Sequence, residues 1–394
     1  DPDYSDFFAT RRAGADYSSV VRPRTTPLFT EFDTTTGPVD VWTTFSADQV
    51  DLDFGNPRVL LASLDVLLTY AARGASFIRL DAIGFLWKQP GTTSLHLPET
   101  HAIIQFWRAC LDDTYPDVLL LTETNVPHRE NISYFGDGTV PEAQMVYQFP
   151  LAPLVLDAYR TGDATTLREW AASLELTVPG TTYFNFLASH DGVGVRPLEG
   201  IADPSAVDGL AQLTRDAGGQ VSSRTGPAGE DVPYELNSTW FDLMAAGHDT
   251  EAARLRHLGS HAIQLALQGI PGIYVHSLFG SPNDGRLFAE TGRARSLNRH
   301  KFTDLPTLEK ELEAGPRAAV FSGVRRLVER RAADSAFHPD NSQTILDLPS
   351  ALFGIERHPV TGPPSRVVVN LTADEVGFDD GSIGPFATSW SSRY

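Results

Sequence analysis

The chain has 394 residues, 41% of them hydrophobic and 21% charged, which is enough material for one large α/β domain with smaller attachments. Its 31 Lys and Arg stand against 50 Asp and Glu, and the net charge of -19 disfavours nucleic acid or an anionic membrane surface as a partner. Cys110 is the only cysteine and no apolar stretch reaches the length of a membrane span, which argues against an intrachain disulfide, a zinc cluster and a transmembrane helix and favours the cytoplasm.

Apolar strand-like runs alternate with helical patterns after residue 50. A helix is predicted over 56–74, where Asn56 can cap, Pro57 stands in the first turn and Gly74 lies beyond the end. A strand follows from Phe77. The later expected elements are a helix over 99–115, strands over 118–125 and 145–149, a helix ending near 170, a strand over 181–191, a helix ending near 268 and a strand over 272–276. Five strands alternating with helices predict an α/β fold with a parallel sheet, either a barrel or a doubly wound sheet.

The rest of the chain does not follow this alternation. Residues 1–50 open in a loop-like, aromatic-rich stretch, and residues 199–250 read as an irregular polar insertion within a barrel portion that spans 51–335. From about residue 343 the pattern changes to short β-like pieces, so residues 336–394 are predicted to form a small C-terminal β domain.

Three carboxylates lie at or near the ends of three different predicted strands. They are Asp81, Glu123 and Asp191. Barrel enzymes collect their catalytic groups at this end of the strands. Each carboxylate could instead cap the helix that follows it, but equivalent positions on three strands favour one shared site.

Carboxylates gathered at a barrel mouth without a metal-ligand cluster suit glycosyl transfer, in which one attacks the anomeric carbon and another protonates the leaving oxygen. Arg79 lies two residues before Asp81 on the same face of the strand, as a structural ion pair or as a cation that keeps Asp81 ionised. Glu123 needs a raised pKa, which the apolar strand before it could cause. Asp191 and the adjacent His190 would bind sugar hydroxyls.

The segments around these residues resemble conserved signatures of the α-amylase superfamily, glycoside hydrolase family 13. "IRLDAIGF", "LLLTETN" and "FLASHDGVG" are similar to its second, third and fourth signatures, in the right order. The resemblance implies a TIM barrel in which Asp81 is the nucleophile, Glu123 the general acid/base and Asp191 the transition-state stabiliser. It also implies that Arg79 and His190 belong to the substrate site.

Further segments resemble the sucrose-phosphorylase-like branch of this superfamily. "VRPRTTPLFTEF", "PYELNSTWF" and "GIPGIYVHSLFGSPND" carry that likeness, and "TETNVPHRENISYFGDGT" is similar to glucosylglycerate phosphorylases within the branch. The resemblance implies a retaining phosphorylase that uses an α-glucoside and inorganic phosphate, with no metal and no other cofactor. Sucrose or glucosylglycerol phosphorylase, a hydrolase or transglucosylase, and an inactive carbohydrate-binding relative are the alternatives, and a homodimer stays open.

The resemblance also assigns residues to the phosphate and acceptor side. Arg24, Tyr234 and Arg299 match positions that contact phosphate or the donor sugar. The remaining matches line the same pocket: Phe45, Gln49, Phe85 and Asn125. Phe85 and Asn125 replace a tyrosine and a histidine of sucrose phosphorylases, which implies an acceptor other than fructose, plausibly glycerate.

Positive charge is concentrated in two stretches of this acidic chain. They are "VRPR", with Arg22 and Arg24, and "TGRARSLNRHK", whose cations are Arg293, Arg295, Arg299, His300 and Lys301. Arginine can bind an oxyanion through two hydrogen bonds, so these stretches predict a phosphate site. Solvated loops that neutralise acidic neighbours are the alternative.

The first signature of the superfamily has no counterpart in this sequence. By the resemblance, residues 1–50 are the remainder of a domain B-type insertion after barrel strand 3, and barrel strands 4 to 8 follow. We therefore expect an incomplete (β/α)8 barrel and a chain that is a fragment of a longer enzyme. Such a fragment alone is expected to be inactive, because its strand edges stay open.

Overall fold

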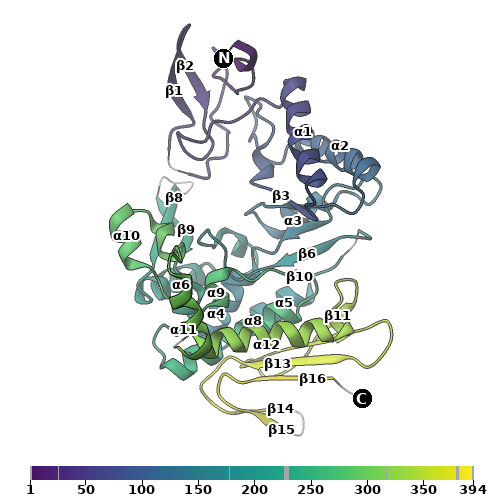
Figure 1. Ribbon diagram of the computed structural model, residues 1–394, viewed down its shortest axis with the longest axis vertical. Helices are drawn as coiled ribbons and strands as arrows, with labels where there is room; N and C mark the ends of the chain where they lie inside the picture. The colour runs from purple at the N-terminus through teal and green to yellow at the C-terminus, as the bar shows by residue number, and fades with distance from the viewer. Residues whose placement is uncertain are drawn as a thin grey trace.

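The computed structural model describes residues 2–24, 26–176, 178–225, 230–315, 317–378 and 381–392. At its centre lies a five-stranded sheet in the order β10-β6-β5-β4-β3, and every neighbouring pair is parallel (Figure 1). The strands are β3 (Phe77–Leu80), β4 (Leu119–Thr122), β5 (Met145–Tyr147), β6 (Thr182–Asn185) and β10 (Ile270–Pro271). Five parallel strands are therefore present, and four of them lie where the sequence predicted them.

Helices join these strands and cover them, as in a (β/α)8 barrel. They are α1 (Pro57–Ala72), α2 (Pro98–Thr114), α3 (His128–Ile132), α4 (Leu151–Thr161), α5 (Thr165–Ala172) and α8 (Thr250–Ala266). The start of α1 agrees with its sequence signals, because the Asn56 side chain accepts a hydrogen bond from the Arg58 N–H at 3.0 Å and Pro57 is the first helical residue. Gly74 follows the helix with φ of +90°, a conformation that favours glycine.

The sheet is buried on both faces. On one face, Leu120 on β4, Val146 on β5 and Tyr183 on β6 are each 0% exposed and belong to one large hydrophobic core; on the other face, Leu121 and Met145 are 5% and 1% exposed. Apolar runs in these strands reflect this two-sided burial. At the two ends of the sheet, β3 and β10 each pair with a single strand among the described residues, and Phe77 on β3 is half exposed.

The strand predicted over 272–276 is wrong. β10 ends at Pro271, and the residues after it turn into the short helix α9 (Val275–Leu278). The Gln264 side chain donates hydrogen bonds to the carbonyls of Asn185 and Gly272, at 3.0 and 2.7 Å. The Gly272 N–H still donates to the Asn185 carbonyl at 2.8 Å, and the pairing of β10 with β6 ends there.

The insertion at 199–250 is not irregular, so this prediction is also wrong. It contains α6 (Pro204–Asp216), the antiparallel strands β8 (Gln220–Thr225) and β9 (Asp231–Asn237), and α7 (Trp240–Ala245). β9 also pairs with β7 (Val193–Gly194), which places the hairpin beside the residues that follow β6. The start of α6 was visible in the sequence, since Asp203 caps it and Pro204 opens it.

The two ends of the chain form smaller sheets at opposite ends of the molecule (Figure 1). Near the N-terminus lies the hairpin β1 (Phe29–Thr34) and β2 (Gly37–Trp42). The C-terminal sheets contain β11 (Ser342–Ile345), β12 (Leu352–His358), β13 (Ser365–Asn370), β14 (Val376–Phe378), β15 (Gly381–Ile383) and β16 (Thr388–Ser392). Before them come α10 (Gly285–Thr291), α11 (Leu305–Ala314) and α12 (Ala318–Ala333).

The C-terminal sheet shares the core of the barrel portion. Phe353, Val367 and Trp390 belong to the same buried cluster as the central strands. The fully buried Arg357 donates to the carbonyl of Ala266 at the end of α8, at 3.0 Å, which ties the two parts together.

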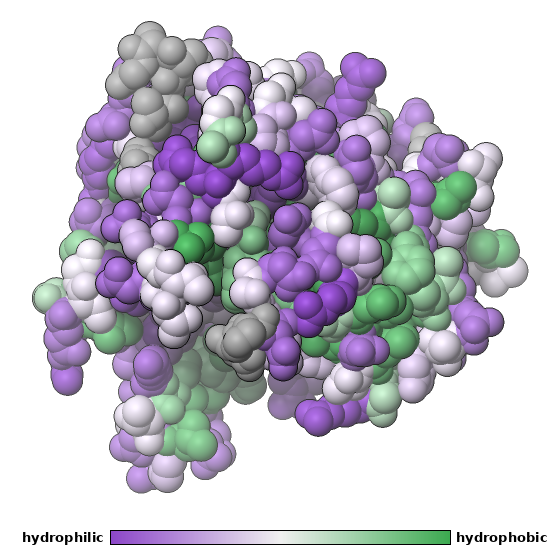
Figure 2. Space-filling model, turned by 90° about the horizontal axis from the view of Figure 1, so that it is seen from above, coloured by the Kyte–Doolittle hydropathy of each residue, from purple (hydrophilic) through white to green (hydrophobic). Residues whose placement is uncertain are grey.

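The surface is largely polar. Figure 2 looks down on the end that carries the β1/β2 hairpin and shows mostly hydrophilic side chains, with hydrophobic ones gathered on the right, the side on which α1 and α2 lie in Figure 1. Leu61, Val66 and Tyr70 on α1 are exposed. Within the described ranges, no helix is both long and apolar enough to span a membrane.

Candidate active site

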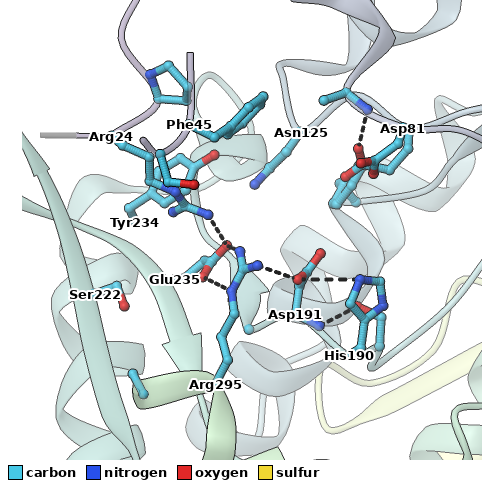
Figure 3. Close-up of a pocket in the computed structure, with 18 of the residues that line it drawn as sticks. Arg24, Phe45, Asp81, Asn125, His190, Asp191, Ser222, Tyr234, Glu235 and Arg295 are labelled. Atoms are coloured by element: carbon cyan, nitrogen blue, oxygen red, sulfur yellow. Dashed lines mark hydrogen bonds and ion pairs between the residues drawn. The ribbon is translucent and has the colours of Figure 1, made fainter. Parts of the chain in front are cut away.

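A cavity of about 940 Å³ opens beyond the carboxyl ends of the central strands. Twelve residues predicted from the sequence line it: Arg24, Phe45, Gln49, Arg79, Asp81, Phe85, Glu123, Asn125, His190, Asp191, Tyr234 and Arg299. In Figure 3, Arg24, Tyr234 and Glu235 lie on one side and Asp81 on the other, with Asn125 between them. The structure therefore brings all of the predicted site residues to one cavity.

Asp81 follows β3 directly and is paired with Arg79. Arg79 Nη1 lies 2.6 Å from Asp81 Oδ1, and Arg79 Nη2 lies 3.7 Å from Glu123 Oε2. Burial lowers the pKa of Arg79, but the Glu123 and Asp81 carboxylates raise it by more. The pKa is therefore raised overall, and the guanidinium stays charged. Ala82, the next residue, has φ of +47°, and the turn leaves 69% of the Asp81 side chain exposed to the cavity and solvent. The Asp81 carboxylate is therefore accessible from the cavity.

Glu123 follows β4 and is far less exposed than Asp81. Only 14% of its side chain is accessible, and its Oε2 accepts a hydrogen bond from the Ala82 N–H at 2.9 Å. The pKa of Glu123 is raised to about 6, chiefly by burial, against the lowering effects of Ala82 and Arg79. Such a carboxyl can hold a proton near neutral pH and release it to a leaving group.

Asp191 follows β6 and is surrounded by cations. Its Oδ1 lies 2.6 Å from Arg295 Nη1, 3.2 Å from Arg299 Nη2 and 3.6 Å from His190 Nε2. The Asn298 side chain donates to the backbone carbonyl of Asp191 at 2.9 Å and so fixes this loop. These contacts hold the Asp191 carboxylate in one orientation.

Glu235 on β9 is a site residue that the sequence did not reveal. It is 5% exposed and accepts two hydrogen bonds from Arg295, with Nε at 3.1 Å and Nη2 at 2.5 Å. Arg24 Nη2 lies 3.6 Å from the same carboxylate, and the Arg24 guanidinium lies 5.4 Å from the centre of the Tyr234 ring. The alternation of apolar and polar residues in "DVPYELN" could have indicated this strand, but residues 199–250 were predicted to be irregular.

An aromatic wall closes another side of the cavity. The rings of Phe45 and Phe85 meet edge to face, with centroids 5.5 Å apart. Behind them the buried Lys88 ammonium lies 2.6 Å from Asp51 Oδ1 and also donates to the Phe85 carbonyl. Because the Asp51 carboxylate accepts from the Thr44 N–H at 2.7 Å, this ion pair joins the loops that carry the two rings.

The two basic stretches contribute unequally. Besides Arg24 and Arg299, the cations Arg293, Arg295 and Lys301 line the cavity. Arg22 instead donates to the Thr26 carbonyl, and the predicted role of His300 is not supported because its Nδ1 lies 2.6 Å from Asp284 Oδ2. In the part of the chain that the structure describes, no group of three or more His, Cys, Asp or Glu side chains could hold a metal ion.

A family model of the α-amylase catalytic domain matches residues 2–197. These residues belong to an α-amylase catalytic domain. A curated relative, the glucosylglycerate phosphorylase of Allomeiothermus silvanus, is 50% identical over 350 residues, which cover 88% of this chain and 63% of the relative. The glucosylglycerate phosphorylase of Escherichia coli is 43% identical over 364 residues, covering 92% and 65%. The chain thus spans less than two thirds of the length of these relatives.

Solved structures support the fold of this chain. The sucrose 6F-phosphate phosphorylase of Thermoanaerobacter thermosaccharolyticum superposes with a TM-score of 0.79 at 22% identity, over 94% of this chain and 74% of that one. An α-amylase from H. orenii gives a TM-score of 0.63 at 15% identity, over 100% and 75%. The predicted barrel portion with a small C-terminal β part is confirmed.

Proposed function

We propose that the protein is a retaining glycoside phosphorylase that converts 2-O-α-glucosylglycerate and inorganic phosphate into α-glucose 1-phosphate and glycerate. The observation that carries the proposal is the meeting, in one cavity, of Asp81, Glu123 and Asp191 with the Arg24 and Tyr234 pair. The identity of 43 to 50% with curated glucosylglycerate phosphorylases supports the choice of substrate.

In the first half-reaction, an Asp81 carboxylate oxygen attacks the anomeric carbon of the glucosyl unit, and the bond to the glycerate oxygen breaks. Glu123 gives its proton to that oxygen. Because Glu123 Oε2 accepts from Ala82, the proton is held on Oε1. The product is a covalent glucosyl-enzyme of β configuration, and the Asp191 carboxylate stabilises the positive charge that develops on the sugar ring.

In the second half-reaction, a phosphate oxygen attacks the same carbon from the opposite face and releases the Asp81 carboxylate. The Glu123 carboxylate takes the proton of the attacking phosphate hydroxyl, which restores the acid. Two inversions at one carbon give net retention, and so α-glucose 1-phosphate. Phosphate is the only co-substrate and the mechanism uses no metal or organic cofactor.

The acceptor side distinguishes this proposal from its nearest alternatives. Sucrose phosphorylase and glucosylglycerol phosphorylase would share the three carboxylates and differ in the group that leaves. Phe85 and Asn125 are assigned to this side, and the cations that line the same cavity suit an acceptor that carries a carboxylate. We expect the protein to work in the cytoplasm, and a homodimer stays a prediction.

The test is a panel of acceptors offered with α-glucose 1-phosphate, with phosphate release as the readout. We expect D-glycerate to give a higher kcat/KM than fructose or glycerol. The assay uses the protein as its gene encodes it. Preference for fructose or glycerol would assign a different phosphorylase, glucose release without phosphate would assign a hydrolase, and no turnover would assign a carbohydrate-binding relative.

A further inference from the structure

The arginines around the cavity differ in how fully their charge is matched. Arg295 lies between two carboxylates, at 2.6 Å from Asp191 and 2.5 Å from Glu235. Arg299 donates to the His190 carbonyl at 2.6 Å and to Asp191 at 3.2 Å. An anion that bound to either of these two would have to displace contacts that orient Asp191, so their first role is to hold that carboxylate.

The charges of Arg24 and Arg196 are less closely paired with carboxylates, although both side chains line the cavity. Among the described residues, the only carboxylate within 4.0 Å of the Arg24 guanidinium is Glu235, at 3.6 Å, and the only one near Arg196 is Glu199, at 4.0 Å. Glu199 itself lies closer to Arg224, at 3.0 Å. Neither cavity arginine makes a hydrogen bond to a carboxylate, so both retain donors for a ligand.

Tyr234 lines the same cavity as these two arginines. The Arg24 guanidinium lies 5.4 Å from the centre of its ring, and the Val195 N–H donates to the Tyr234 carbonyl at 3.1 Å, so Arg196 belongs to the segment next to it. The pKa of Tyr234 is raised by burial and by Glu235, and Arg24 and Arg196 lower it.

We propose that Arg24 and Arg196, together with Tyr234, form a clamp that binds the anionic group of the acceptor, and that Arg196 is its second specificity-determining cation. This inference rests on the proposed function. The clamp takes the phosphate in one half-reaction and the carboxylate of glycerate in the reverse one, since each guanidinium can offer two N–H groups to an oxyanion. Arg299, which the sequence assigned to phosphate, acts through Asp191 instead.

The kinetic test compares charged and neutral acceptors of the glucosyl-enzyme. Arg196→Gln is expected to raise the KM for phosphate and for D-glycerate about tenfold or more, because one charge-assisted contact is lost, with less than a twofold change in transfer to glycerol. Arg196→Lys, which keeps the charge, should recover part of the loss. Arg299→Gln should instead lower kcat with all three acceptors alike.

Arg215→Gln, on the exposed face of α6, is the matched control, because it removes an arginine that does not line the cavity. It should leave all three acceptors unaffected. Equal losses with phosphate, glycerate and glycerol in Arg196→Gln would show a structural role and overturn the clamp. Loss with glycerate alone would also overturn it and make Arg196 a carboxylate-specific residue.

A binding measurement separates this inference from the proposed function. Inorganic phosphate should raise the Tm of the wild-type protein, and Arg196→Gln should remove most of that shift while the Tm without phosphate stays near the wild-type value. If the wild-type protein shows no phosphorolysis, the proposed function fails, whereas in this measurement the clamp fails if Arg196→Gln keeps the full shift.

Discussion

Glu235 and Arg295 form a two-point ion pair in which Nε and Nη2 of the arginine meet the two oxygens of the carboxylate. The pair joins the β8/β9 hairpin to the segment that follows α10, and the remaining Nη1 of Arg295 reaches Asp191. A carboxylate outside the catalytic trio therefore orients the arginine that orients Asp191.

This relationship predicts a large coupling energy between the two residues. In a double-mutant cycle of Glu235→Gln, Arg295→Met and the double variant, we expect a coupling of about 1–3 kcal/mol in the free energy of unfolding, measured by denaturant titration. Their side chains are only 6% and 30% exposed, so solvent screens them little. The same cycle on Arg286 and Glu290, an exposed pair at 2.8 Å, should give at most about 0.5 kcal/mol, and similar values for the two pairs would contradict the prediction.

Asp81→Ala should lower kcat with 2-O-α-glucosylglycerate by at least about three orders of magnitude, because the covalent route is lost. A small external anion such as azide should restore turnover and give a product of inverted, β configuration, since a single displacement then replaces two. Asp65→Asn, on the exposed face of α1, is the control and should behave as wild type. Ordinary activity in Asp81→Ala would remove this residue from the nucleophile's role.

The raised pKa of Glu123 predicts the alkaline limb of the rate profile. Protonated Glu123 is needed for cleavage, so kcat/KM should fall as the pH rises through about 6, whereas an ordinary glutamate would give this fall near 4.5. A substrate whose leaving group needs no proton should lack the limb in its first half-reaction, as should Glu123→Gln. A limb that persists in Glu123→Gln would have to come from another group.

The same pKa predicts a cost in stability. Folding raises the pKa of Glu123 from 4.5 to about 6. The contribution of its protonation to the free energy of unfolding is therefore complete below pH 4.5 and is lost as the pH rises through about 6. That shift corresponds to about 2 kcal/mol, so Glu123→Gln should gain about that much relative to wild type between pH 4 and pH 8. Unfolding titrations at both values check it, with Glu309→Gln, on the exposed face of α11, as a control that should show no such gain.

The sequence predicted the residues whose position follows from local patterns. Asp81 and Glu123 each end an apolar strand, and parallel strands place their carboxyl ends side by side, so their meeting could be expected. The contact of Glu235 with Arg24 and Arg295 joins segments far apart in the chain, and no local period encodes it. Lys88 illustrates the same limit. The sequence does not indicate that its ammonium group is buried or that Asp51 lies beside it.

The error over 272–276 has a related cause. "GIYVH" has the composition of a strand, and the sequence could not show that the chain would leave the sheet after Pro271 and turn into α9. Strand propensity describes how residues fit a sheet and depends on the tertiary context in which they lie.

The two sides of the cavity are built from different kinds of structure. Asp81 and Glu123 continue strands whose register is fixed by the buried core, whereas Phe45 and Arg24 come from loops near the β1/β2 hairpin and Tyr234 from the β8/β9 hairpin. Substitutions in such loops and hairpins disturb the core less than substitutions in its strands. A lineage that carries this architecture can therefore exchange one acceptor for another by small steps, while it keeps the same sugar and the same anomeric outcome. Descendants of one ancestor should differ first in the acceptor that they release.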